Sequence, residues 1–244
     1  MEKKENIEIK KEVVDLEKND KIIVDLTADS DDDEALPDPK AIPAESAPQS
    51  GKKFKIGTEW REIIDKKPAD VVVTSVGWKT LGVPYKYTFS ELVENSGGLS
   101  DTLLSSWGTP AQDIYLDCRA LKDDSVKRLL MHTGFHVDIM EAVVKHRNFR
   151  NLLKQTKDLA KQCKDKGRAT SIMAVCTSGA HRSVILAEAI AFCVRKDGHE
   201  VVGPSHLSWS SWKDRKLCWT CERCKDEKKR EQLHGIVYEM WKSA

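Results

Sequence analysis

The segment Cys-Thr-Ser-Gly-Ala-His-Arg-Ser at residues 176–183 gathers groups that bind anions. An apolar β-type run precedes it and an apolar helix-type run follows, so successive backbone N–H groups and the positive end of a helix dipole would converge there. Gly179 lets the backbone curl close to a ligand, and the guanidinium of Arg182 can bind two phosphate oxygens at once. His181 can add a charge or a proton, and hydroxyl donors come from Thr177, Ser178 and Ser183. The segment therefore predicts a pocket for a phosphate-like anion.

The same spacing, C-x-x-G-x-x-R-S, is similar to the phosphate loop of cysteine-dependent phosphatases. In that chemistry a thiolate attacks phosphorus, which would make Cys176 a nucleophile beside Arg182. Two features weaken this alternative. Val175 stands where those phosphatases carry a histidine, and no second motif supplies a general acid, although Asp117 and Asp123 are candidates. A small buried cysteine at a strand end is also common without any reactivity.

The remaining apolar pattern predicts the elements that position this segment. Expected strands are a β-branched run at residues 71–75 and further apolar runs at 114–118, 171–175 and 200–202. Expected helices, from apolar residues at helical spacing, cover residues 133–146, 149–166 and 184–196. Alternation of strands and helices favours an α/β fold with a mostly parallel sheet and flanking helices. Ligands of such sheets bind outside the carboxyl ends of the strands, where Asp117 and Arg119 also fall.

Four motifs in order resemble one known family. They are S-x-G-x-K-x-x-G-x-P at residues 75–84, D-x-R-x-L at 117–121, T-G at 133–134 and C-T-x-G-x-H-R-S-V at 176–184. With them, residues from 71 to about 206 resemble the C-terminal domain of RapZ, the bacterial RNase adapter protein. The resemblance implies an anion pocket for a phosphorylated amino sugar, a basic surface for structured RNA, a homo-oligomer and no catalytic turnover.

Carried over residue by residue, the resemblance assigns thirteen positions to the anion pocket: Lys79, Asp117, Arg119, Thr133, Gly134, Cys176, Thr177, Ser178, Gly179, His181, Arg182, Ser183 and His206. The sequence departs from the family at several other places. A polar stretch at about 86–111 is inserted, and Lys-Asp-Asp at 122–124 replaces Pro-Asn-Pro. His136 stands where the family has Asp, and Leu207 where it has Arg. The phosphate contacts carry over, whereas the sugar specificity does not.

The family's nucleotide-binding domain has no counterpart, since no G-x-x-x-x-G-K-[ST] occurs, and no ATP-dependent activity is predicted. For RNA, the polar face of the helix at 149–166 offers Arg150, Lys154, Lys157 and Lys161, which suit phosphate contacts. The alternative is an ordinary solvated helix face.

Residues 1–52 form an acidic, aromatic-poor tail that is predicted to be disordered. Within residues 1–50, seven lysines face fifteen acidic residues, a balance of −8 that leaves +9 for the rest of a chain with net charge +1. The apolar run at 22–26, followed by TADSDDDE, resembles a SUMO-interacting motif, which adds as a strand to a partner's sheet. SUMO is therefore a predicted partner, with an inert tail as the alternative.

Residues 208–244 are foreign to the family and form a Cys- and Trp-rich extension. Cys218, Cys221 and Cys224 follow one another at two-residue gaps, as zinc ligands do. A zinc site needs a fourth ligand, for which His206 and His234 are available. Zinc is the one cofactor considered, and an amphipathic helix is expected at the end of the chain.

The chain thus divides into a tail at 1–52, an α/β domain at 69–207 and the extension at 208–244. Seven cysteines in a chain without a secretory signal indicate reduced thiols, and no run approaches the ~18 apolar residues of a membrane span. A cytoplasmic or nuclear protein without membrane attachment is expected. The predicted function is a non-catalytic regulatory module that binds a phosphorylated small molecule and RNA. The alternatives are a phosphatase using Cys176 and Arg182, and a SUMO-linked scaffold.

Overall fold

A computed structural model describes residues 22–24, 69–81, 89, 112–122, 124–163 and 169–244 of the chain. The disorder predicted for residues 1–52 lies outside these ranges, apart from Ile22–Val24, which form strand β1. Most of the polar insertion at 86–111 also lies outside them. Among the helices described, none is both long enough and apolar enough to cross a membrane.

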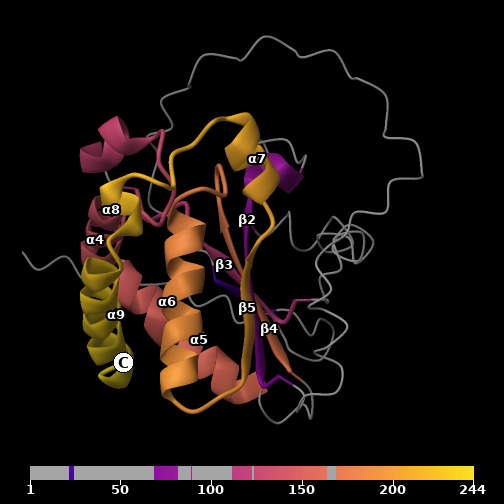
Figure 1. The fold of residues 1–244 in the computed structure, drawn as a ribbon. Helices are drawn as coiled ribbons and strands as arrows, with labels where there is room; N and C mark the ends of the chain where they lie inside the picture. Colours follow the sequence, from indigo (N-terminus) through magenta and orange to yellow (C-terminus); the bar gives the residue numbers. More distant parts are fainter. Residues whose placement is uncertain (1–21, 25–68, 82–88, 90–111, 123, 164–168) are drawn as a thin grey trace, which may run out of the picture.

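The centre of the fold is a parallel sheet with strand order β1-β3-β4-β2-β5 (Figure 1). Its other strands are β2 (Val71–Gly77), β3 (Ile114–Asp117), β4 (Thr170–Cys176) and β5 (Val201–His206). Every pairing is parallel. All residues of β4 are buried, as expected of a strand covered on both faces. The predicted α/β class with a mostly parallel sheet is confirmed.

The long helices pack together against one face of this sheet (Figure 1). They are α4 (Val137–Lys145), α5 (Phe149–Cys163), α6 (Arg182–Lys196) and α9 (Glu227–Lys242). The main apolar core lies between them and the strands, and α6 is buried along most of its length. From α9, Leu233, Val237 and Trp241 enter the same core. The end helix expected from the sequence is thus docked on the α/β domain.

A second apolar cluster covers the opposite face of the sheet. Its largest members are Trp78 of the 3-10 helix η1 (Trp78–Leu81), Phe89 and Tyr115, all fully buried. Because η1 follows β2 directly, Trp78 packs beside the strand ends. This cluster therefore forms one wall of the region where a ligand is expected.

The carboxyl ends of four strands meet at one edge of the sheet. Gly77 pairs with Cys176, Asp117 with Val175, and Ser75 with His206. Three short helices complete the fold: η2 (Asp124–Leu129), α7 (Trp209–Asp214) and α8 (Glu222–Lys225). In Figure 1, α7 lies beyond the upper ends of β2 and β5. The motifs found in the sequence converge on this edge.

Strand β1 was not predicted as part of the sheet. Ile22, Ile23 and Val24 pair in parallel with Ile114, Tyr115 and Leu116 of β3. The residues that resemble a SUMO-interacting motif thus add to the edge of the chain's own sheet. An apolar β-branched segment suits such an edge, because it offers unpaired N–H and C=O groups to any extended chain.

Candidate functional site

The loop between β4 and α6 is the segment for which the sequence predicted anion binding. None of the backbone N–H groups of residues 177–181 donates a hydrogen bond within the part of the chain that the structure describes. Gly179 adopts a positive φ of 65°, which turns the backbone toward the start of α6. Uncommitted N–H groups at a helix N-terminus attract negative charge.

Two glycines allow this loop to approach the end of β2. A Cβ on Gly77 would lie 2.5 Å from the amide nitrogen of Gly179, closer than real atoms come. Ser208, which is fully buried, supports the same contact: its Oγ accepts from the Gly77 N–H at 2.8 Å and lies 2.7 Å from Thr80 Oγ1. Ser208 was not predicted as part of the site, since a serine after β5 carries no signal of its own.

The guanidinium of Arg182 lies between the loop and the chain that follows β3. Its Nη1 donates to the carbonyl oxygen of Arg119 at 2.6 Å, and its Nη2 donates to Thr177 Oγ1 at 3.3 Å. Arg119 is bound in turn by Asp117, with the shortest contact at 2.6 Å, and its guanidinium lies 4.5 Å from the centre of the Trp78 ring. Asp117 at the end of β3 and Arg119 just after it therefore hold Arg182 beside the loop.

Cys176 is buried and has little access to a substrate. Its exposed fraction is 1%, and its sulfur lies 3.1 Å from Ser183 Oγ. The neighbouring thiol of Cys118 is fully buried, and burial, followed by the proximity of Cys176 and Asp117, raises the pKa of Cys118 well above the usual value. The burial of Cys176 suits a packed side chain better than an exposed nucleophile.

His181 was expected to contribute a charge or a proton to the pocket, and its surroundings argue against the charge. Its Nε2 donates to the carbonyl oxygen of His132 at 2.6 Å, so this nitrogen carries the proton. Burial lowers the pKa of His181 to about 4, so the ring is neutral near pH 7. His181 therefore adds no positive charge to the loop at that pH.

The Thr133-Gly134 turn packs against the back of the loop. The Gly134 N–H donates to the Ala180 carbonyl oxygen at 2.7 Å, and a Cβ on Gly134 would lie 2.8 Å from the His181 carbonyl oxygen. Two buried polar atoms in this region, Thr133 Oγ1 and Trp78 Nε1, have no hydrogen-bond partner within the described chain. Water or a ligand would satisfy them.

The last two predicted pocket residues lie on either side of the loop. Lys79 has an exposed side chain, and its backbone N–H donates to the Thr177 carbonyl oxygen at 3.2 Å. The ring of His206 bridges Ser75 Oγ at 2.8 Å and Glu188 Oε1 at 3.1 Å. His206 is thus held between β2 and α6 by side chains.

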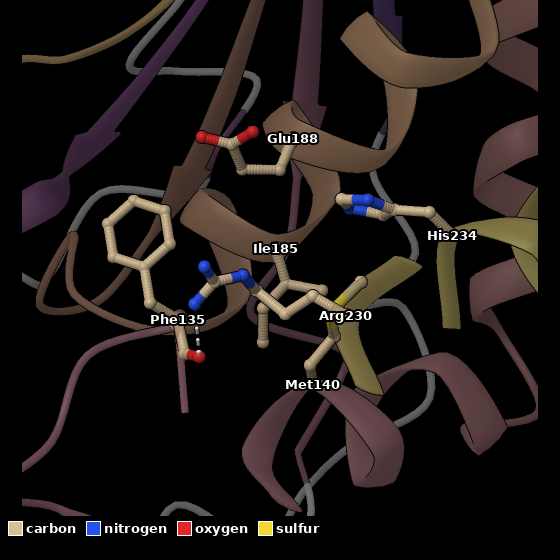
Figure 2. Close-up of a pocket in the computed structure, with 7 residues that line it drawn as sticks. Phe135, Met140, Ile185, Glu188, Arg230 and His234 are labelled. Carbon is tan, nitrogen blue, oxygen red and sulfur yellow. Dashed lines mark hydrogen bonds between the residues drawn. The ribbon is translucent and has the colours of Figure 1, made fainter. Parts of the chain in front are cut away.

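A separate small pocket lies between α4, α6 and α9 (Figure 2). It is lined by Gly134, Phe135, Met140, Ile185, Glu188, Arg230 and His234. Arg230 donates to the Phe135 carbonyl oxygen at 3.5 Å, whereas the buried Nε2 of His234 has no partner in the described chain. Its volume of about 200 Å³ is below the range of typical ligand pockets, roughly 300–1,000 Å³. The sequence did not indicate this pocket, because its lining comes from three separate helices and from the turn before α4.

The four candidate RNA contacts on α5 divide into two pairs. Arg150 donates to Ser243 Oγ at 3.1 Å, and Lys157 Nζ donates to the Trp241 carbonyl oxygen at 2.6 Å. These two side chains therefore bind the end of α9. Lys154 and Lys161 are exposed.

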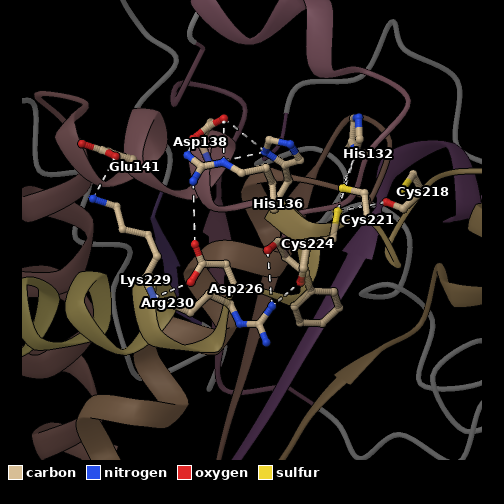
Figure 3. Close-up of polar contacts among 12 residues, drawn as sticks. His132, His136, Asp138, Glu141, Cys218, Cys221, Cys224, Asp226, Lys229 and Arg230 are labelled. Atoms are coloured by element: carbon tan, nitrogen blue, oxygen red, sulfur yellow. Dashed lines mark hydrogen bonds and ion pairs between the residues drawn. The ribbon is translucent and has the colours of Figure 1, made fainter.

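The three cysteines of the extension meet a histidine that the sequence did not suggest. Cys218, Cys221 and Cys224 gather around His132, as Figure 3 shows. The two histidines considered from the sequence lie elsewhere: His206 binds Ser75 and Glu188, and His234 stacks on Phe192 with ring centres 4.7 Å apart. Since His132 is 89 residues from Cys221, only the fold identifies it.

No curated protein matches the chain. Residues 105–208 match the family model of the RapZ C-terminal domain. The match includes the D-x-R-x-L, T-G and C-T-x-G-x-H-R-S-V motifs. It begins after β2, so the S-x-G-x-K-x-x-G-x-P motif and the strand that lies between β4 and β5 in the sheet are outside the matched residues. The loop of 176–183, the guanidinium beside it and the turn behind it all fall within the matched residues, so this part of the chain is similar to the RapZ C-terminal domain.

Proposed function

We propose that this chain is a non-catalytic regulatory module that binds a phosphorylated small molecule at residues 177–182. One observation carries the proposal: uncommitted backbone N–H groups of the loop lie beside the Arg182 guanidinium, which the Arg119 carbonyl holds in place. The match of residues 105–208 to the family model of the RapZ C-terminal domain supports a regulatory role of the kind that an RNase adapter has.

A phosphate group suits this arrangement because it can accept from several donors at once. Its oxygens would accept from loop N–H groups and from Arg182, which already reaches Thr177 Oγ1. The two glycines matter here, since a side chain on either would push the loop away from β2. A phosphorylated sugar is the ligand class we infer.

The surroundings of Cys176 favour binding over phosphatase chemistry. A nucleophilic thiolate needs access to phosphorus, whereas Cys176 is buried against Ser183. Asp117, one of the two candidate general acids, is occupied by Arg119 through contacts of 2.6–3.0 Å, and the other, Asp123, lies outside the described residues. Cys176 and Asp117 therefore have roles in holding the loop.

Calorimetric titration of the full chain tests the proposal. The ligands are inorganic phosphate, a phosphorylated amino sugar and the same sugar without phosphate. We expect saturable binding of the two phosphorylated ligands and none of the plain sugar. Absence of binding by both would refute the proposal. Hydrolysis of an aryl phosphate that is lost in Cys176→Ser would instead support the phosphatase.

RNA is the second ligand we propose, on the exposure of Lys154 and Lys161 and the +9 balance outside the first 50 residues. Contacts to RNA phosphates release counterions, so affinity should fall steeply with salt. Filter binding with a structured RNA over a salt series tests this. Lack of affinity at low salt would remove RNA from the proposal.

A SUMO-linked scaffold is a further hypothesis, based on β1. Because β1 pairs with β3 along one edge, a SUMO-type partner would have to take the other edge or displace it. Pull-down with the full chain and with Ile22→Ala, Ile23→Ala and Leu26→Ala combined tests this. Equal capture by both chains would exclude the tail as the recruiting element.

A further inference from the structure

Four potential metal ligands converge where the C-terminal extension meets the α/β domain. One ligand atom each from His132, Cys218, Cys221 and Cys224 lies within 4.8 Å of all the others. Figure 3 shows the three sulfurs and the imidazole turned toward one another. The thiols are free, so no disulfide accounts for their approach.

The distances agree with tetrahedral coordination. A zinc ion with Zn–S bonds near 2.3 Å and Zn–N bonds near 2.0–2.1 Å places sulfur and nitrogen about 3.6 Å apart. The His132 Nδ1 lies 3.7 Å from the sulfur of Cys221 and 3.5 Å from that of Cys224. A hydrogen bond from one thiol to the His132 imidazole would explain one of these distances. It would not explain why the other two thiols also lie within 4.8 Å of the imidazole and of each other.

The backbone around the cluster is already organised. Residues 131–133 and Cys218 form a parallel bridge, with the Cys218 N–H donating to the Met131 carbonyl at 2.7 Å and the Thr133 N–H to the Cys218 carbonyl at 3.2 Å. These two backbone hydrogen bonds place Cys218 beside His132.

From this geometry we propose that His132, Cys218, Cys221 and Cys224 bind one structural zinc ion. Three thiolates and one imidazole suit zinc better than calcium or magnesium, which prefer oxygen ligands. Four protein ligands leave no open position, so the site is structural and not catalytic.

The zinc site joins the extension to the turn that supports the anion loop. The extension contributes only short helices near this point, α7 and α8, and few of their residues are buried. A metal compensates where an apolar core is too small to hold such a segment. The carbonyl oxygen of the ligand His132 accepts from His181 in the loop. Zinc would thus hold residues 131–134 in position behind residues 179–181.

The metal content of the purified full chain tests the proposal. After dialysis with a reductant and zinc reconstitution, elemental analysis should find about one zinc ion per chain. Cys221→Ser and His132→Ala should each lose most of this zinc. The control variants Cys163→Ala and His199→Ala, which change a buried cysteine and a half-buried histidine outside the cluster, should retain it.

Cobalt substitution and a rescue variant separate ligation from general damage to the fold. Co²⁺ bound to thiolates in a tetrahedral site gives intense visible absorption, which we expect from the wild-type chain. His132→Cys should keep about one metal per chain with a stronger sulfur-to-metal band, because a fourth thiolate replaces the imidazole. No zinc uptake by the folded wild-type chain, or full zinc content in both Cys221→Ser and His132→Ala, would overturn the proposal. Either result would leave the phosphate proposal untouched.

Discussion

The backbones of Gly179 and Gly77 touch, since a Cβ on Gly179 would lie 2.4 Å from the Gly77 amide nitrogen and 2.2 Å from Ser208 Oγ. Gly179→Ala should therefore lower the free energy of unfolding by more than the ~1–2 kcal/mol that a left-handed backbone alone costs an alanine. Gly198→Ala is the matched control, because φ is also positive there, 86°, but nothing lies within 4 Å of the added Cβ. Urea unfolding of both variants measures the difference. Equal losses would contradict the close approach of loop and strand.

Replacing Arg182 with lysine should weaken phosphate binding. A lysine keeps the charge but loses the planar fork that reaches both the Arg119 carbonyl and Thr177 Oγ1. Loss of one charge-assisted hydrogen bond, ~1.5–3 kcal/mol, corresponds to at least a roughly tenfold higher Kd in calorimetry. Arg195→Lys serves as the control, since Arg195 lies in the last turn of the same helix and donates to the Gly203 carbonyl. Unchanged affinity in Arg182→Lys would remove this side chain from the site.

The basic residues of α5 should separate into RNA contacts and structural contacts. Lys154→Ala and Lys161→Ala should each reduce the slope of log affinity against log salt by about 1 or less, without loss of stability. Lys157→Ala should instead lower the free energy of unfolding by about 0.5–1.5 kcal/mol, because its Nζ donates to the Trp241 carbonyl. Filter binding and urea unfolding of all three variants measure both effects. The reverse pattern would place the RNA surface elsewhere.

His234 should contribute to loss of stability in acid. Burial lowers the pKa of this imidazole below its usual value near 6.5, while Glu188 and Glu231 raise it and Arg230 lowers it further. The folded chain thus favours the neutral ring, so its contribution is complete above about pH 6.5 and declines as the pH falls below that value. His234→Phe keeps an aromatic ring for stacking on Phe192 and removes the titration. Unfolding measured from pH 7.5 to 5 should show a shallower decline in the variant, and parallel curves would count against the burial of His234.

Cys193 should resist alkylation in the native chain. Burial, with a smaller effect of Asp197, raises the pKa of its thiol to about 12, so almost no thiolate forms at pH 8. Mass spectrometry after iodoacetamide treatment should find Cys193 unmodified until denaturant is added. The unfolded chain under the same conditions provides the comparison. Rapid native labelling would mean that α6 opens readily.

The local elements were predictable because their signals are local. Strand β2 coincides with a β-branched run, β3 and β4 coincide with apolar runs, and α6 coincides with an apolar stretch that begins directly after the anion loop. The order of these elements was enough to predict a parallel sheet with a ligand site at the strand ends. The division into a tail, a domain and an extension stays a prediction from composition.

What the residues determined by themselves is the chemistry of two short segments: a glycine-turned loop with one arginine, and three thiols at metal-ligand spacing. The tertiary structure decided which distant residues meet. It placed Ser208 against Gly77, His132 among the cysteines, and Ile22–Val24 beside β3. The physical reason is that periodicity and spacing report on neighbours along the chain. A contact across some ninety residues depends instead on how the helices and the sheet pack, which no single segment encodes.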